Sequence, residues 1–376
     1  MTDTSLTTDA PVRERLEKPT LIYPFEAPPE VGKALEVAPG VVWMRMPLPM
    51  ALNHINVWGI EDVGESGEPG WALVDTGMRT DETLAAWRDL FAGARDQGPD
   101  PGSVTRVIAT HMHPDHIGMA GWLTRKFSCR LWMTRLEYLN CRVLTADTGR
   151  EAPEDGVAFY RRAGWSESAI ENYQARFGNF GKRIHVLPDS YRRMVDGEEI
   201  RMGANTWRVI VGTGHSPEHA CLYSETLKVL ISGDQVLPRI SSNVSVHPTE
   251  PDADPMREWL ESLAKLKREV PDDVLVLPSH DECFRGLHAR LDYLAASQLR
   301  TLDRLRKTLR EPRRVVDVFA ALFGRSIDPT DGGLLNLATG ESLACLNYLL
   351  HRGELLKTLD DAGVAHYQTQ IQIQMR

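Results

Sequence analysis

The chain has 376 residues, a formal net charge of −9, 42% hydrophobic residues and 25% charged residues. Its length suits one large globular domain with a smaller one, and its acidic balance argues against a general binder of nucleic acid or membrane surfaces. No apolar run reaches the roughly 18 residues that a membrane span requires. Five scattered cysteines without CxxC spacing favour a reducing cytoplasm as the expected location.

The N-terminal part of the chain is predicted to alternate strands and helices. Residues 1–20 are polar, lack the apolar core of a signal peptide, and are predicted to form a flexible tail. The elements expected next are β-rich runs over 40–75, a helix over 81–98, a strand over 103–110, a helix over 116–127 and a strand over 129–134. This alternation predicts an α/β layered domain.

Residues 134–190 differ in pattern and are predicted to form an inserted helical cap. Helical segments over 135–149 and 167–178 flank an aromatic group, Phe159, Tyr160 and Trp165, which is expected mainly to pack in a core. The elements expected after the cap are strands within 198–214, 220–234 and 273–280, a long helix over 287–309, shorter helices near 314–323 and 341–360, and a strand over 363–376.

Histidine and aspartate residues gather directly after several predicted strands. In the stretch HMHPDH, His111 and His113 alternate, so they point the same way in an extended segment, and Asp115 and His116 follow in a turn. The same residue types recur after three later strands, at His215, Asp234 and His280. One histidine at a strand end is usually an ordinary hydrogen-bonded residue, but a sheet collects strand ends along one edge. Imidazole and carboxylate ligands suit zinc, iron and manganese, so the pattern predicts a metal centre.

This ligand pattern resembles that of the metallo-β-lactamase superfamily. The H-x-H-x-D-H motif spans 111–116, a V-D-T-G turn spans 74–77, and the resemblance covers about 40–285. It implies an αββα sandwich that carries the helical cap as an insertion and holds two divalent metal ions, with Zn²⁺ expected and Fe or Mn as alternatives. The first metal would be held by His111, His113 and His215, and the second by Asp115, His116 and His280. Asp234 would bridge them, and Asp75 would either support a ligand or only cap its own turn.

The presence of Asp234 makes the ligand set similar to that of glyoxalase II. Antibiotic-cleaving members commonly lack this aspartate, and flavodiiron oxygen reductases carry a glutamate where His113 stands. The C-terminal part lacks a clear glutathione-binding pattern and instead resembles the winged-helix tail of lactamase-like proteins that include an endoribonuclease. The expected division is therefore a tail over 1–20, a metallo-β-lactamase-like domain over 21–285 with its cap over 134–190, and a small, mostly helical, winged-helix-like domain over 286–376.

A dinuclear hydrolase is the expected function. Two bound cations would lower the pKa of a shared water, so that a hydroxide bridging the metals exists at neutral pH. Asp234 is expected to orient it and Asp115 to accept its proton, which makes these the predicted catalytic residues. A thiolate leaves without much help from a general acid, and no clear acid is found. A thioester, either of coenzyme A or of glutathione, is therefore the expected substrate.

Other substrate contacts and functions stay open at this point. The candidates for the pocket wall are Arg239, Asn243, His247 and His54, each of which could equally be an ordinary polar loop residue. The alternative functions are a phosphodiesterase or endoribonuclease on the same metals, a lactonase, and a winged-helix interaction protein with a vestigial metal site. A small-molecule substrate is the expected partner; nucleic acid is disfavoured by the acidic balance, no membrane contact is expected, and the oligomeric state is not indicated.

Overall fold

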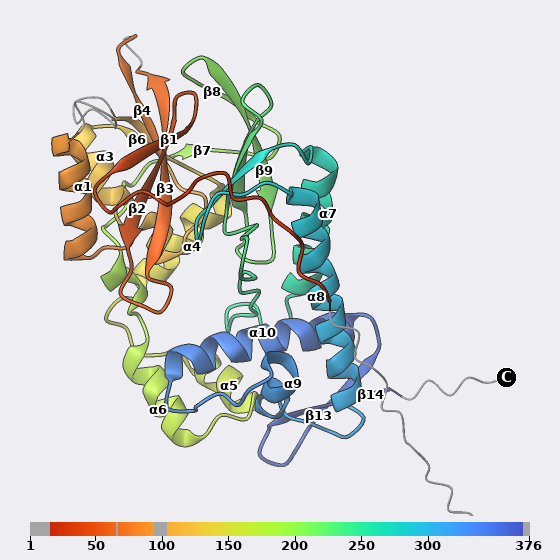
Figure 1. Cartoon of the computed structure of the whole chain (residues 1–376). Coiled ribbons are helices and arrows are strands. Elements are labelled where there is room, and N and C mark those ends of the chain that lie inside the picture. Colours follow the sequence, from red (N-terminus) through yellow and green to blue (C-terminus); the bar gives the residue numbers. More distant parts are fainter. Residues whose placement is uncertain (1–15, 65–66, 94–103, 371–376) are drawn as a thin grey trace, which may run out of the picture.

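The computed structural model describes residues 16–64, 67–93 and 104–370 (Figure 1). Most of the predicted tail, the end of the predicted helix over 81–98 and the last residues of the predicted closing strand lie outside these ranges. Within them, no helix has the length and apolar character needed to cross a bilayer.

Most of the described strands belong to two sheets. The first has the strand order β1 (Ala34–Ala38), β2 (Val41–Pro47), β3 (His54–Val63), β4 (Pro69–Val74), β5 (Val104–Ile108), β6 (Arg130–Met133) and β7 (Arg192–Arg193). The second has the order β12 (Leu275–Pro278), β11 (Val229–Gly233), β10 (His219–Ser224), β9 (Asn205–Gly212) and β8 (Glu199–Met202). In the first sheet, β4 pairs with β5, β5 with β6, and β6 with β7, all in parallel. In the second sheet, β11 and β12 are parallel.

The two sheets pack face to face around a shared core. Strand β2 shows the alternation, because Trp43 belongs to the cluster between the sheets, whereas Met44 belongs to the cluster on the outer face. Trp43 stacks on Trp58 with ring centroids 6.0 Å apart, and Trp207 from the second sheet is buried in the same inner cluster. Both faces of β2 are therefore buried, which explains its nearly continuous apolar sequence.

Helices cover both outer faces of this sandwich. The first sheet is covered by α1 (Asp81–Gly93), α3 (Ala120–Phe127) and α4 (Arg135–Ala146), after the short α2 (Pro114–Ile117), and the second by α7 (Pro255–Glu269) and α8 (Leu287–Thr308). Figure 1 shows α1 and α7 on opposite sides of the molecule. The predicted αββα class is confirmed. Helix α7 and strand β1 were not among the expected elements.

The inserted segment packs in two different places. Helix α4 buries Tyr138 and Cys141 against the first sheet. In contrast, α5 (Glu154–Arg162) and α6 (Glu167–Arg176) pack against the C-terminal helices, and η1 (Phe180–Arg183) leads back to the sheet. Trp165 is buried in the same cluster as Leu346, so a packing role is the one observed for this aromatic side chain.

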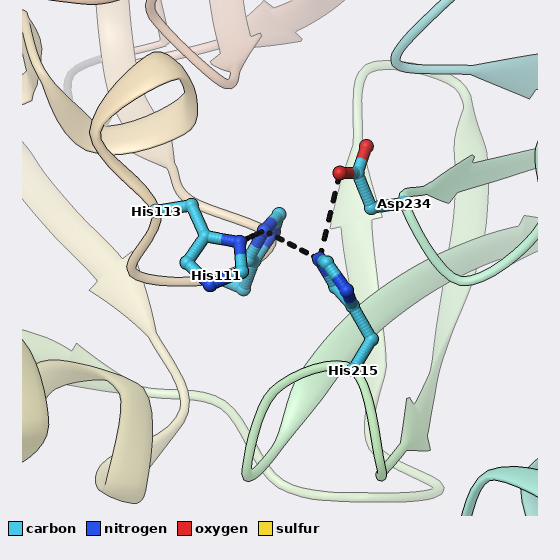
Figure 2. A group of neighbouring side chains, drawn as sticks. All are labelled: His111, His113, His215 and Asp234. Carbon is cyan, nitrogen blue, oxygen red and sulfur yellow. Dashed lines mark hydrogen bonds and ion pairs between the residues drawn. The ribbon is translucent and has the colours of Figure 1, made fainter. Parts of the chain in front are cut away.

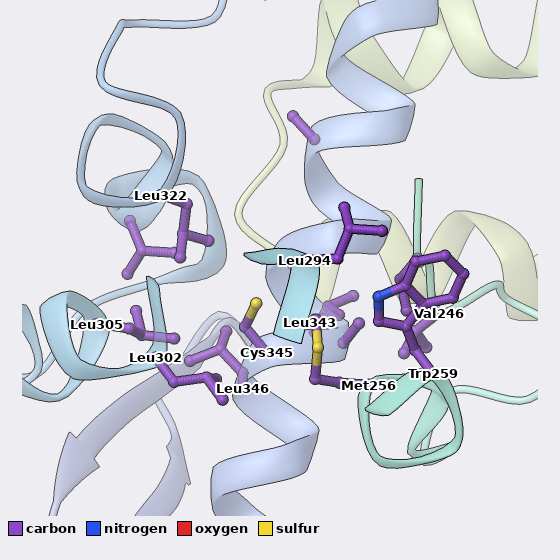
Figure 3. Close-up of a cluster of buried hydrophobic side chains, with 14 of the residues drawn as sticks. Val246, Met256, Trp259, Leu294, Leu302, Leu305, Leu322, Leu343, Cys345 and Leu346 are labelled. Carbon is purple, nitrogen blue, oxygen red and sulfur yellow. The ribbon is translucent and has the colours of Figure 1, made fainter. Parts of the chain in front are cut away.

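The C-terminal helices continue from α8 and end in a small hairpin. The elements are η2 (Val315–Val318), α9 (Phe319–Phe323), α10 (Gly332–His351), β13 (Leu355–Leu359) and β14 (Ala365–Thr369). The predicted helix over 341–360 is wrong in its bounds. Asp331 accepts hydrogen bonds from the backbone N–H groups of Gly333 and Leu334, so this cap starts α10 earlier, and residues 355–359 pair with β14 instead. Figure 3 shows the cluster that α8, α9 and α10 share.

A core substitution in α10 tests the contribution of this cluster. Leu346 is fully buried, so Leu346→Ala should lower the free energy of unfolding by about 3 kcal/mol, because it removes apolar contacts and leaves a cavity. Leu356 is 53% exposed, and Leu356→Ala should change stability by less than about 0.5 kcal/mol. Urea denaturation of both variants measures the difference, and equal midpoints would contradict the assigned packing.

Candidate metal centre

The predicted ligands lie in segments that follow four strands. The segment after β5 carries the H-x-H-x-D-H motif, with Asp115 and His116 in the short helix α2, and the loops after β9, β11 and β12 each supply one further side chain. Because these strand ends meet at one edge of the sandwich, residues far apart in sequence become neighbours. The side chains brought together are His111, His113, Asp115, His116, His215, Asp234 and His280.

Three histidines form a first group with one oxygen of Asp234. His111 Nε2 lies 2.8 Å from His113 Nδ1 and 3.3 Å from His215 Nε2. Oδ2 of Asp234 lies 3.5 Å from His215 Nε2. Figure 2 shows the three rings and this carboxylate directed toward one point.

A second group lies on the other side of Asp234. His280 Nε2 is 3.5 Å from Asp115 Oδ2, and His116 Nε2 is 3.7 Å from the same oxygen. Oδ1 of Asp234 lies 3.4 Å from both imidazole nitrogens. Asp234 therefore presents one oxygen to each group.

The donor atoms fit divalent cations. Among the described residues, His116 Nε2 and Asp234 Oδ1 are buried without a hydrogen-bond partner. Leaving a buried polar atom unsatisfied costs about 1–3 kcal/mol, which a bound cation would remove. Imidazole nitrogens with carboxylate oxygens are a ligand set that zinc, iron and manganese accept. These residues therefore suit a metal site better than a purely structural polar cluster.

Four of the histidine rings have a partner at their other nitrogen, and the first is His111, whose Nδ1 lies 3.0 Å from the hydroxyl oxygen of Thr110. His215 Nδ1 donates to the backbone carbonyl of Asn243 at 2.7 Å, and His280 Nδ1 donates to that of His54 at 2.9 Å. His116 Nδ1 lies 2.8 Å from Asp75 Oδ2. Such bonds fix which nitrogen carries the proton and direct Nε2 toward the metal.

Asp75 is built into the protein interior behind His116. It is fully buried, has a positive φ of 60°, and also accepts hydrogen bonds from the backbone N–H and the hydroxyl of Thr110. Burial alone would lower the pKa of His116, but the carboxylates of Asp75 and Asp234 raise it well above its usual value. The structure thus places Asp75 against a predicted ligand, in addition to its place in a turn.

The remaining predicted contacts lie around this centre in different ways. Arg239 is paired with Glu282 at 2.9 Å and lies over the ring of Tyr23. His247 is exposed and close enough to His113 for their charges to interact. The side chain of Asn243 bonds to Glu341 at 3.0 Å.

His54 contributes mainly through its backbone. Its carbonyl orients His280, whereas its ring nitrogen Nε2 accepts the backbone N–H of Asp281 at 3.0 Å. Burial lowers the pKa of His54 to about 4, so the ring is neutral at physiological pH. The neutral ring is what this acceptor role requires, because a protonated imidazole has no free lone pair.

Glu137 is a residue that sequence analysis missed. Its carboxylate is fully buried at the start of α4 and accepts the backbone N–H of Met112 at 2.9 Å and that of Glu218 at 2.8 Å. It therefore ties the loop of His111 and His113 to the loop that carries His215. A glutamate in the first turn of a helix is ordinarily a solvated residue, so the sequence gives no local sign of this role.

Comparison with known proteins places the chain in a family. Residues 53–280 match the metallo-beta-lactamase superfamily domain, and residues 302–370 match the C-terminal domain of metallo-beta-lactamase-like proteins. The chain therefore belongs to the metallo-beta-lactamase superfamily and is a metal-dependent hydrolase of that class. Divalent metal ions are implied by the family and by the side-chain groups described above.

Relatives and solved structures agree with this assignment. A beta-lactamase domain protein from Burkholderia ambifaria is 38% identical, with a TM-score of 0.83 over 93% of this chain and 98% of that chain. A probable metallo-hydrolase of Bacillus subtilis, YqjP, is 24% identical over 74% of this chain and 80% of its own length. An atrochrysone carboxyl ACP thioesterase of Aspergillus fumigatus is 29% identical over 64% of this chain and only 41% of its own length.

A substitution of Asp75 tests its support of His116. Asp75→Asn keeps a residue type that tolerates the positive φ but removes the negative charge beside the imidazole. We expect metal affinity to fall by about tenfold, measured by competition with a chromophoric chelator. Asp281→Asn is the matched control, because Asp281 also has a positive φ of 66° and its Oδ2 makes no hydrogen bond among the described residues. Equal metal affinities for the two variants would contradict the role of Asp75.

Proposed function

We propose that the protein is a dinuclear hydrolase that cleaves thioesters. The observation that carries the proposal is the division of Asp234 between the two groups, with Oδ2 near His215 and Oδ1 near both His116 and His280. A shared carboxylate of this kind suits two cations side by side. Zinc is the expected metal, with iron or manganese as alternatives.

The roles of the side chains follow from their positions. When bound, two divalent cations would supply an activated water at neutral pH and a positive charge for the developing oxyanion. Asp234 would orient the attacking water between the groups. Asp115 would accept its proton, since its Oδ2 lies 3.5 Å from His280 and its side chain keeps some exposure to solvent. We assign Arg239, Asn243, His247 and His54 to the surroundings of the substrate site.

Two observations support a thioester over other substrates. His247 lies beside the first group, and desolvation together with the charge of His215 lowers the pKa of its imidazole, so the ring carries no proton to donate at neutral pH. A thiolate leaves without such a donor, whereas an amine does not. One of the relatives is described as an ACP thioesterase. The proposed acyl carrier is coenzyme A or glutathione.

The other proposed properties follow from composition and from the cysteines. The thiols of Cys129, Cys141, Cys221, Cys283 and Cys345 are free. Free, mostly buried thiols suit a reducing cytoplasm, which we propose as the compartment.

The winged-helix character of the C-terminal part and the domain boundary near residue 285 stay predictions. Phosphodiesterase, lactonase and interaction roles are the alternatives that the substrate test below separates.

Metal analysis tests the dinuclear centre. Purified protein supplemented with zinc should contain close to two metals per chain, because both groups of ligands are complete. Asp234→Ala should lower the metal content and reduce kcat by at least about 100-fold, since it removes the shared carboxylate. Elemental analysis measures the content, and less than half a metal per chain in the wild type after supplementation would refute the proposal.

A substrate panel tests the reaction. The zinc-loaded protein should hydrolyse acyl-CoA or acyl-glutathione thioesters with a kcat/KM at least about tenfold above that for a matched lactone, β-lactam or phosphodiester. Chelation should abolish turnover, and added zinc should restore it. Thiol release followed with a disulfide reagent measures the rate. Faster cleavage of a phosphodiester or lactone than of every thioester would replace the thioester assignment with the corresponding alternative.

A further inference from the structure

Helix α10 of the C-terminal part reaches the loop that orients one of the proposed ligands. Residues 241–247 form neither helix nor strand, yet this segment supplies the Asn243 carbonyl that accepts the bond from His215 Nδ1. No strand partner fixes that carbonyl, so its position depends on individual contacts of the segment. In Figure 1 the chain before α7 descends from the second sheet to α10.

The segment is tied to α10 by two hydrogen bonds. Asn243 Nδ2 donates to Glu341 Oε2 at 3.0 Å, and the backbone N–H of Val246 donates to the carbonyl of Gly340 at 3.0 Å. A Cβ at position 340 would lie 2.7 Å from Ser245 Oγ and 3.0 Å from the carbonyl oxygen of Val246. Only glycine allows this approach without displacement, so helix and segment are fitted to each other.

The side chain of Asn243 is bonded at both of its polar ends. Its Oδ1 accepts a hydrogen bond from Ser245, and its Nδ2 is directed to Glu341. Its amide plane is thereby fixed, and the adjoining backbone carbonyl is fixed with it. Glu341 is partly buried with an amide as its partner. Desolvating a carboxyl group in this way is costly, and an apolar residue on a purely structural helix face would avoid that cost.

We propose that Glu341 is a positioning residue for the metal centre: through Asn243 it holds the carbonyl that sets the tautomer and orientation of His215. The inference rests on the proposed metal centre but not on the proposed substrate. It makes α10, which lies outside the matched superfamily domain at 53–280, part of the support of the first group of ligands.

The test uses the full-length protein loaded with zinc. Glu341→Met removes the acceptor at similar volume, and Glu341→Gln keeps an acceptor oxygen for Asn243. Because burial raises the pKa of Glu341 to about 7, glutamine also resembles the neutral form that glutamate adopts below that pH. Trp165→Phe is the matched control, since it removes the bond from Trp165 Nε1 to Thr339 Oγ1, two residues earlier on α10, without touching Asn243.

Zinc release to excess 4-(2-pyridylazo)resorcinol is the readout. We expect Glu341→Met to release its first zinc about tenfold faster than the wild type, whereas Glu341→Gln and Trp165→Phe should stay within about twofold. Asn243→Ala should release zinc about as fast as Glu341→Met. The double variant should release zinc no faster than the faster of the two single variants, because both substitutions break the same chain of contacts to His215. Asn243→Ala also serves as the test should Glu341→Met fail to fold.

Two results would overturn the inference, and they differ from failure of the proposed function. Equal release rates for the wild type, Glu341→Met and Asn243→Ala would show that the contact does not hold His215. Equal acceleration by Trp165→Phe would show a general loosening of α10. A wild type that binds two zinc ions but cleaves no thioester would refute only the substrate, whereas a wild type that binds no zinc would refute the metal centre and this inference together.

Discussion

The placement of Asp234 is the constraint on which the centre depends. Its carboxylate reaches both groups only because its backbone is held, and its N–H donates to His219 Nε2 at 3.0 Å. Gly233, which precedes it, has a φ of 52°, and a Cβ there would lie 2.4 Å from the same ring nitrogen. Burial lowers the pKa of His219 to about 3, so the ring stays neutral and keeps its lone pair. A histidine that belongs to neither group of ligands thus fixes the residue that both groups share.

Sequence predicted the strands and the side chains of the centre because both depend on local pattern. Apolar runs followed by glycine, proline or histidine mark strand ends, and strands that run in the same direction, such as β9 and β11, bring those ends to one edge. His111, His215 and His280 could therefore be placed together without knowledge of any contact. The supporting atoms could not be predicted in this way. The carbonyls of Asn243 and His54 orient rings, and a backbone carbonyl carries no residue-specific signal.

The errors in the helical regions have a similar cause. The apolar residues of 355–359 continue the spacing of α10, but the tertiary partner β14 makes them a strand. Glu137 and Glu341 resemble ordinary helix-surface glutamates in the sequence, and only their partners 25 to 98 residues away distinguish them. The cap was predicted as one unit because its helices are consecutive in the chain. Its two halves in fact pack against different layers, α4 against the first sheet and α5 and α6 against α10.

The second half of the inserted segment belongs to the same buried cluster as the helices that support the centre. The buried cluster on the outer face of the second sheet is continuous from α7 and α8 to α5, α6 and α10. Asn347 of α10 makes a further link to this part of the chain. Its Nδ2 donates hydrogen bonds to the backbone carbonyls of Pro251 and Ala253, just before α7 begins. The segment between Asp234 and α7 is therefore held by α10 at two places, by Gly340 and Glu341 in the middle of the helix and by Asn347 nearer its C-terminal end. Since protein interiors are close-packed and shift in discrete steps, a displacement of α10 would be transmitted to the carbonyl behind His215 rather than absorbed in between.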